Sequence, residues 1–381
     1  MEPKIKNYLW LVCTFILSIQ WIVLHYSHVH TGIIGDALFP GICIFAAAFI
    51  LSWAADLSQY YIPQSLALIF LALIAVLPEY AVDMYFAWTA GKNPEYISYA
   101  AANMTGGNRL LVGVGWPLIS IVFWLKTKKT VIELTKENRR EIITLLIATI
   151  YSFTIPLKGS LTLADTAILL TIFVVYLVLA SRAEHVEPEP EEGPVELLSR
   201  LPHVLRGILT LFFFVFAGFC IYISAEPFSE GLLHIGAKTG IDKFILVQWI
   251  APLASEAPEL IVALIFVLNQ HPEAGLRTVI SSKINQWTLL VGMLPLVYNL
   301  SLGKIQPMVL DFRQIEEILL TAAQSLFALV ILIKLRFKII DAILLLVLFL
   351  TQLFIPSPTI RFIYSGIYIL LAILFFLFRK K

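Results

Sequence analysis

Four acidic residues lie inside apolar stretches of the sequence and occur as two pairs. Glu79 and Asp83 are four positions apart, and Glu256 and Glu259 are three apart. On a helix these spacings place both members of a pair on one face. A charged side chain at mid-membrane costs about 2.5 to 3.5 kcal/mol, so such acids are expected to face a partner or a polar cavity. They predict cation binding, with structural ion pairs between helices as the alternative.

Proline directly precedes one acid of each pair, in Pro78-Glu79 and Pro258-Glu259. Proline removes a backbone hydrogen bond, which frees a carbonyl of the preceding turn. Carbonyl oxygens beside carboxylates are hard ligands suited to Ca²⁺, Na⁺ or proton-linked exchange.

Two polar stretches follow the acid pairs, each within an otherwise apolar span. They read AANMTGGNRLLVG and SSKINQWTLLVG, and they supply Asn103, Thr105, Gly106, Gly107, Asn108, Ser281, Ser282, Asn285 and Gln286. These residues either add oxygen ligands or, where they are small, allow close helix packing. Arg109 and Lys283 each bring a positive charge into one stretch, so both are predicted to modulate the charge of the site. If these two cationic side chains meet the four ionised acids, the net charge of the site is −2. This charge suits one divalent or two monovalent cations, although coupled carboxylates also share protons.

Four landmarks recur along the chain at offsets of 178 to 180 residues: Pro78-Glu79 with Pro258-Glu259, Pro94-Glu95 with Pro272-Glu273, LLVG at 110 with LLVG at 289, and Pro117 with Pro295. Their conserved order predicts an internal repeat. The predicted repeats are residues 31–181 and 204–355.

Apolar runs long enough to cross a bilayer predict an all-α polytopic membrane protein with about 12 transmembrane helices. The predicted spans are 8–27, 33–55, 64–90, 96–123, 141–156, 161–181, 204–225, 243–269, 274–299, 314–333, 337–354 and 358–378. Equivalent positions are five spans apart, and this odd number inverts the second copy relative to the first. Helices 2–6 therefore pair with helices 7–11. Two extra helices remain, one at the N-terminal end (1–30) and one at the C-terminal end (356–381), and both are expected to pack at the periphery.

Composition supports this class, since 59% of the 381 residues are hydrophobic and only 14% are charged. A single water-soluble core is excluded. The net charge of +1 shows no bias toward nucleic acid. Cys13, Cys43 and Cys220 show no zinc or disulfide spacing, and the histidines form no cluster within a span. No Walker, HExxH or protease motif is present, so a transporter is favoured over an enzyme, and no cofactor is expected.

The loop charges predict the orientation of the chain. Apart from Arg109 and Lys283, eighteen Lys and Arg residues fall on the side of both termini, and seven, including Arg361, on the other. Positive charge marks the cytoplasmic side, so both termini are expected inside the cell. Residues 182–203, with the acidic run HVEPEPEEGPVE, form a predicted cytoplasmic linker between the repeats.

At these motifs the chain resembles the Ca²⁺/cation antiporter superfamily, which includes the sodium/calcium exchangers, over about residues 33 to 355. The second copy, Ala254-Ser255-Glu256-Ala257-Pro258-Glu259, is similar to the superfamily's Gly-Thr-Ser-x-Pro-Glu motif, whereas the first keeps only Pro78-Glu79. The resemblance implies that Glu79 and Glu259 are the central metal ligands. It implies further ion-binding oxygens from Asn103, Ser255, Ser282, Asn285 and Gln286, with Asn108 competing with Asn103. Lys283 stands where the superfamily has a small or polar residue, which leaves open whether its ammonium replaces a bound cation.

The resemblance implies a secondary antiporter that works by alternating access and exchanges Ca²⁺ for Na⁺ or H⁺. A Na⁺/H⁺ antiporter on the same fold is the first alternative. A membrane scaffold or sensor, whose acids are neutralised by Lys283 and Arg109, is the second. The expected partners are inorganic cations and the lipid bilayer of the plasma membrane, and the sequence does not specify the oligomeric state.

Overall fold

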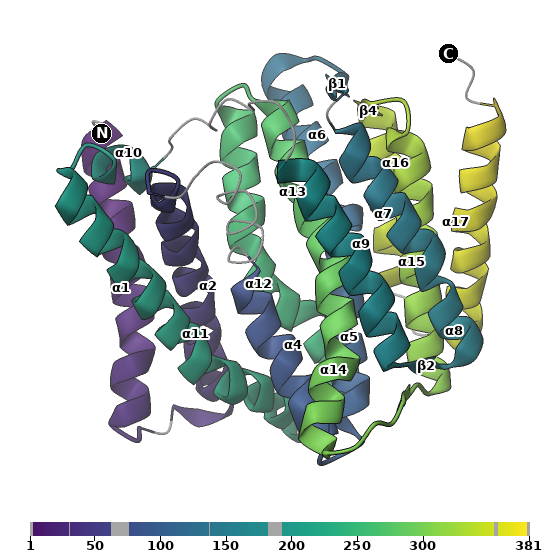
Figure 1. The fold of residues 1–381 in the computed structure, drawn as a ribbon, viewed down its shortest axis with the longest axis horizontal. Helices are drawn as coiled ribbons and strands as arrows, with labels where there is room; N and C mark the ends of the chain where they lie inside the picture. The colour runs from purple at the N-terminus through teal and green to yellow at the C-terminus, as the bar shows by residue number, and fades with distance from the viewer. Residues whose placement is uncertain are drawn as a thin grey trace. The chain divides into compact units, whose positions relative to one another are not determined.

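Helices make up most of the chain in the computed structural model, which describes residues 3–29, 31–61, 76–136, 138–181, 193–353 and 357–378. The α-helices (Figure 1) are α1 (Pro3–Tyr26), α2 (Gly32–Ser58), α4 (Leu77–Ala90), α5 (Tyr96–Leu110), α6 (Trp116–Thr127), α7 (Arg139–Ser152), α8 (Thr154–Lys158), α9 (Leu163–Ser181), α10 (Pro194–Leu198), α11 (His203–Thr239), α12 (Lys243–Leu268), α13 (Pro272–Asn285), α14 (Val291–Leu302), α15 (Phe312–Leu332), α16 (Ile339–Leu353) and α17 (Pro358–Phe378). Two π-helical turns, η1 (Leu111–Gly115) and η2 (Gln286–Leu290), join α5 to α6 and α13 to α14.

The predicted membrane-spanning architecture is confirmed, but the count of twelve stays a prediction. Within the described ranges, nine helical segments are long and apolar enough to cross a membrane. Three predicted spans are not among them. The first, 64–90, lies partly outside the described residues, and the second, 274–299, corresponds to α13, η2 and α14, which together carry several charges. The third, 337–354, is the shorter helix α16.

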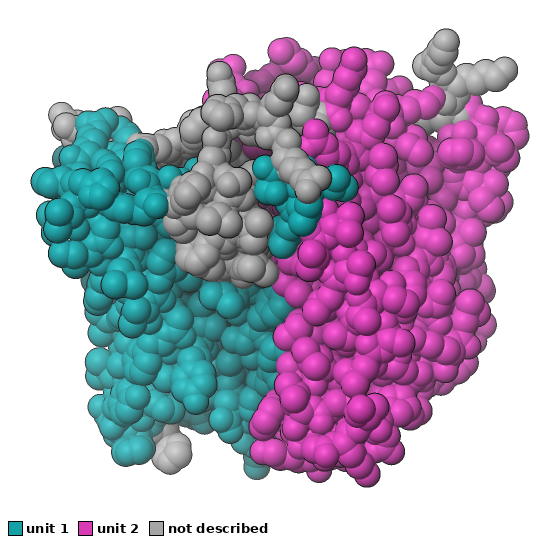
Figure 2. All heavy atoms as spheres, in the orientation of Figure 1, with its two compact units in different colours: residues 1–85, 177–259 teal, residues 86–176, 260–381 magenta. Residues whose placement is uncertain are grey.

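The described chain forms two compact units that cut across the predicted repeats (Figure 2). Unit 1 comprises residues 1–85 and 177–259, and unit 2 comprises residues 86–176 and 260–381. Each unit contains equivalent helices from both predicted repeats: α2 and α11 belong to unit 1, and α5 and α13 to unit 2.

Unit 1 is built on a long contact between α2 and α11, with α1 alongside (Figure 1). Small residues let the two helices approach, since a Cβ on Gly231 would lie 2.8 Å from the backbone of Ala37, and one on Gly41 would lie 2.8 Å from the Phe228 ring. The predicted span 204–225 proved too short. Helix α11 continues through Pro227 to Thr239 and has 37 residues, about 55 Å at 1.5 Å per residue. Pro227 has no N–H to donate to the Ile223 carbonyl, and this carbonyl accepts a hydrogen bond from Trp21 Nε1 of α1 at 3.4 Å.

Close helix packing in unit 2 accounts for the glycine at the end of each LLVG motif. A Cβ on Gly292 of α14 would lie 2.7 Å from Leu170 of α9, and one on Gly113 of η1 would overlap Phe349 of α16. Each glycine thus admits a side chain from the last helix of the other predicted repeat. The glycines allow this close helix contact because they lack a side chain of their own.

Four short strands in unit 2 were not predicted. β1 (Val131–Glu133) pairs antiparallel with β4 (Arg336–Lys338), and β2 (Ser160–Leu161) pairs antiparallel with β3 (Met308–Val309). An offset of 176 to 177 residues relates β1 to β3 and β2 to β4. Each sheet therefore joins one strand from each repeat, and the repeat relation exchanges the two sheets. A two-fold relation between the repeats requires this exchange.

The structure adds detail at the predicted linker and corrects the placement of Arg361. The predicted linker contains α10 (Pro194–Leu198), whose Val195 and Leu198 are buried, and the rest of its acidic run, 182–192, lies outside the described residues. Arg361, which was assigned to a loop, lies within α17 and is buried. Its side chain binds carboxylates of α15, and this contact explains the difference.

Candidate ion-binding site

The acids of α4 are buried in unit 1. Glu79 and Asp83 are 3% and 2% exposed, and Glu79 lies in the first turn of the helix. Pro78 stands beside it in that turn, where the lack of an N–H is tolerated. The positive end of the helix dipole favours a carboxylate at this position. Pro78 therefore breaks no hydrogen bond within α4 itself, and the carbonyl that it is predicted to free, that of Ile74, lies outside the described residues.

Helix α12 presents its acids differently, because Pro258 lies within the helix. Proline has no N–H to donate to the carbonyl of Ala254, one turn earlier. Ser255 is buried, and its hydroxyl lies 3.4 Å from the carbonyl oxygens of Ala251 and Pro252. Glu256 is buried and Glu259 is partly exposed. The carbonyl of Ala254, the buried Ser255 and the buried Glu256 are therefore candidate oxygen ligands beside the interior proline of α12.

Unit 1 also holds an acid, Glu230, for which no role was predicted. The Tyr85 hydroxyl of α4 donates to Glu230 Oε1 of α11 at 2.7 Å. Glu230 lies in the part of α11 that the predicted span left out. Within the described ranges, no three His, Cys, Asp or Glu side chains converge as a preformed metal centre. The acids of unit 1 therefore need other oxygens to complete a cation site.

Amide groups in unit 2 are buried without the hydrogen bonds such groups normally make. Asn103 is 4% exposed and Gln286 is 1% exposed. Asn103 Oδ1 and both Gln286 amide atoms have no hydrogen-bond partner among the described residues. Ser282 and Asn285 are buried on the same stretch of α13. An unsatisfied buried polar group costs about 1 to 3 kcal/mol, so these amides are suited to a ligand that supplies the missing contacts.

Lys283 and Asn108, in contrast, bind each other. Lys283 Nζ donates to Asn108 Oδ1 at 2.7 Å and to the Asn108 carbonyl oxygen at 3.2 Å. It also lies 4.5 Å from the centre of the Trp287 ring, within cation–π range. In unit 2 the ammonium of Lys283 on α13 is therefore held by a residue of α5.

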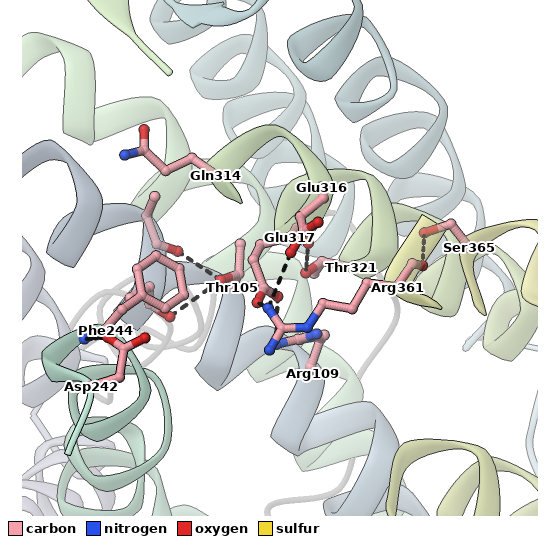
Figure 3. Close-up of polar contacts among 12 residues, drawn as sticks. Thr105, Arg109, Asp242, Phe244, Gln314, Glu316, Glu317, Thr321, Arg361 and Ser365 are labelled. Atoms are coloured by element: carbon pink, nitrogen blue, oxygen red, sulfur yellow. Dashed lines mark hydrogen bonds and ion pairs between the residues drawn. The ribbon is translucent and has the colours of Figure 1, made fainter. Parts of the chain in front are cut away.

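Arg109 belongs to a separate buried network on α5, α15 and α17 (Figure 3). Its Nη2 lies 2.7 Å from Glu317 Oε2. Arg361 Nη1 also contacts Glu317, and it lies 3.3 Å from Glu316 Oε1. Two guanidinium groups and two carboxylates balance within this network. Arg109 is therefore neutralised inside unit 2, and the extra helix α17 is joined to the core by an ion pair.

Glu316, Glu317 and Arg361 were not predicted to interact. The sequence does indicate such a network, because two adjacent glutamates lie inside the predicted span 314–333 and acids in a membrane span require a partner. Their repeat counterparts at an offset of 176 are Arg140 and Glu141. Glu141 accepts a hydrogen bond from Asn138 Nδ2 at 2.8 Å. The network is therefore a feature in which the two repeats differ.

Comparison with known proteins identifies the relatives of this chain. The sodium/calcium exchanger protein family matches residues 32–182 and 209–357. The solved structure entitled "Crystal Structure of H+/Ca2+ Exchanger CAX" is 44% identical in sequence, with a TM-score of 0.94 over 97% of this chain and 94% of that one. The comparison with curated proteins finds no match.

Two more distant structures share the fold. YfkE is 15% identical, with a TM-score of 0.64 over 96% of this chain and 99% of that one. The sodium-calcium exchanger NCX_Mj is 17% identical, with a TM-score of 0.56 over 85% of this chain and 99% of that one.

Proposed function

This chain belongs to the sodium/calcium exchanger protein family, and we propose that it exchanges Ca²⁺ for H⁺ across a membrane by alternating access. It is a secondary cation antiporter rather than an enzyme. The proton as coupling ion is supported by the similarity to a structure entitled an H⁺/Ca²⁺ exchanger.

The observation that carries the proposal is the two acid pairs, Glu79 with Asp83 on α4 and Glu256 with Glu259 on α12. An ionised carboxylate either binds Ca²⁺ or takes up a proton and becomes neutral. One Ca²⁺ or two protons neutralise the same two carboxylates, so the two loads exclude each other. The unloaded carboxylates retain a charge that the membrane interior disfavours, so the loaded states are the ones that reorient. Exchange follows from these two conditions.

Each polar residue has a proposed role in this cycle. Glu79 and Glu259 are the central Ca²⁺ ligands, and Asp83 and Glu256 are the neighbouring acids that adjust charge and accept protons. Ca²⁺ takes six to eight oxygen ligands, which is more than two carboxylates supply. The remaining oxygens come from Asn103, Ser255, Ser282, Asn285 and Gln286. The Asn103 amide oxygen and the Gln286 amide, which have no hydrogen-bond partner among the described residues, support this assignment.

The orientation of the protein is also a proposal. Both termini lie on the cytoplasmic side of the plasma membrane, because the loops on that side carry most of the Lys and Arg residues. The two segments matched by the family, 32–182 and 209–357, support the division into two repeats.

Transport by purified protein in sealed vesicles tests the function. An imposed pH gradient is expected to drive uptake of radioactive Ca²⁺, and Glu79→Gln or Glu259→Gln is expected to abolish it while the protein remains folded. Glu133→Gln, at an exposed acid of β1, is the matched control and retains transport. Normal exchange in both site variants contradicts the proposal. Proton-driven Na⁺ uptake without Ca²⁺ uptake instead identifies a Na⁺/H⁺ antiporter. If none of the tested ions is transported, a scaffold or sensor is favoured.

A further inference from the structure

Lys283 is held in unit 2 as a bound cation is held. Its side chain is fully buried. Its ammonium donates to the side-chain oxygen of Asn108 at 2.7 Å and to the backbone oxygen of Asn108 at 3.2 Å, and it faces the Trp287 ring. Neutral oxygens are also ligands of monovalent metal cations, and an aromatic face attracts a cation of any kind. These groups therefore form a cation-binding environment in which the cation is part of the protein.

Asn108 is fixed in the orientation that this environment requires. Its amide Nδ2 donates to the Met104 carbonyl at 2.8 Å, one turn earlier, so Oδ1 points away from the helix backbone toward Lys283. The π turn η1 begins three residues after Asn108. Such turns interrupt the regular hydrogen-bond ladder and are frequent at functional sites. The Asn108 carbonyl, which accepts from Lys283, lies next to this interruption.

The positive charge of Arg109 does not bind at the Asn108 oxygens. Arg109 follows Asn108 directly, but its guanidinium is bound to Glu317 of α15. The ammonium at Asn108 is therefore supplied by α13.

We propose that Lys283 is a tethered cation that fills a monovalent-cation subsite at Asn108 and thereby excludes Na⁺ as a coupling ion. This inference rests on the proposed exchange function and makes Lys283 its specificity-determining residue. Removing the ammonium leaves the Asn108 oxygens available to a small cation that arrives from solution. The proposal thus predicts a gain of Na⁺ dependence, which general damage to the fold does not produce.

The experiment measures Ca²⁺ uptake into vesicles with an outward Na⁺ gradient at equal pH on both sides, with choline replacing Na⁺ in the reference. The parent protein is expected to respond to a pH gradient and not to Na⁺. In Lys283→Ala, the Na⁺ gradient is expected to raise uptake about tenfold over the choline reference. Lys283→Arg keeps a tethered charge and is expected to ignore Na⁺. Lys304→Ala, at an exposed loop lysine, is the matched control and behaves as the parent.

A double variant tests whether Asn108 supplies the ligand. Adding Asn108→Ala to Lys283→Ala removes the side-chain oxygen, so the acquired Na⁺ response is expected to fall. Binding is read independently as a Na⁺-dependent rise in the thermal unfolding temperature of Lys283→Ala, which the parent lacks.

Separate outcomes decide the two proposals. If the parent shows no gradient-driven Ca²⁺ uptake, the exchange function fails. If the parent exchanges but folded Lys283→Ala shows neither Na⁺-driven uptake nor Na⁺-dependent stabilisation, the tethered cation is wrong. Should Lys283→Ala not fold, Lys283→Gln replaces it, because it retains most of the side chain without the charge, and the same two measurements decide.

Discussion

Arg109 and Glu317 form a buried ion pair, with 2.7 Å between Nη2 and Oε2 and both side chains almost fully excluded from the surface. The pair joins α5, which carries two proposed site amides, to α15. Arg361 extends it to α17, outside the predicted repeats. The twelfth predicted span is therefore joined to the core by charge as well as by apolar packing.

Glu317→Gln is expected to destabilise the protein strongly. It leaves two guanidinium groups buried with one carboxylate fewer, and breaking one partner of a buried pair costs about 3 to 5 kcal/mol. The measurement is the unfolding temperature in detergent, with Glu133→Gln as the exposed control.

The Arg109→Met/Glu317→Leu double variant removes both charges of one pair and is expected to lose less stability than Glu317→Gln. Equal stability of Glu317→Gln and the parent would show that the pair contributes little.

The buried amides are expected to serve ion binding rather than folding. Asn103→Leu removes an oxygen that has no partner among the described residues, so stability without Ca²⁺ should be unchanged or higher. The Ca²⁺ concentration for half-maximal exchange should rise about tenfold to a hundredfold, the equivalent of losing one interaction with a charged ligand.

Asn299 provides the matched control for Asn103. It is also buried, but its Nδ2 donates to Pro295 at 2.7 Å and its Oδ1 accepts from the Gln306 N–H at 2.5 Å. Asn299→Leu should therefore lower the unfolding temperature without changing the half-maximal Ca²⁺ concentration. The assignment of Asn103 is wrong if the two variants behave alike.

Gly113→Ala is expected to destabilise unit 2, because the added methyl overlaps Phe349 of α16. Overpacking of this kind costs about 1 to 3 kcal/mol. Phe349→Ala in the same protein makes room for the methyl, so the double variant should be more stable than the sum of the single effects predicts. A double-mutant cycle of unfolding temperatures measures this, and strict additivity would exclude the contact.

Tyr85→Phe removes the hydroxyl that donates to Glu230 on α11. A hydrogen bond to a charged group contributes about 1.5 to 3 kcal/mol, and a loss of that size is expected in detergent unfolding. Glu230→Gln should lose less, because its amide oxygen still accepts the Tyr85 hydroxyl. The reverse order would show that the carboxylate has another main role.

The sequence alone determined the class of the protein and predicted the role of its acids. Long apolar runs require helices in lipid, since backbone groups there must be satisfied within the segment. The Pro-Glu pairs and the LLVG motifs repeat at nearly constant offsets, so the repeat was detectable without coordinates. An acid in an apolar span indicates function on energetic grounds alone.

Tertiary structure decided which charges meet, because partners far apart in sequence leave no mark in local spacing. Arg109 and Lys283 look alike in sequence, yet one binds Glu317 and the other Asn108. The two Pro-Glu pairs also look alike, yet Pro78 lies in the first turn of α4 and Pro258 lies inside α12. Which partner a buried charge meets depends on packing between helices, which composition and periodicity do not encode.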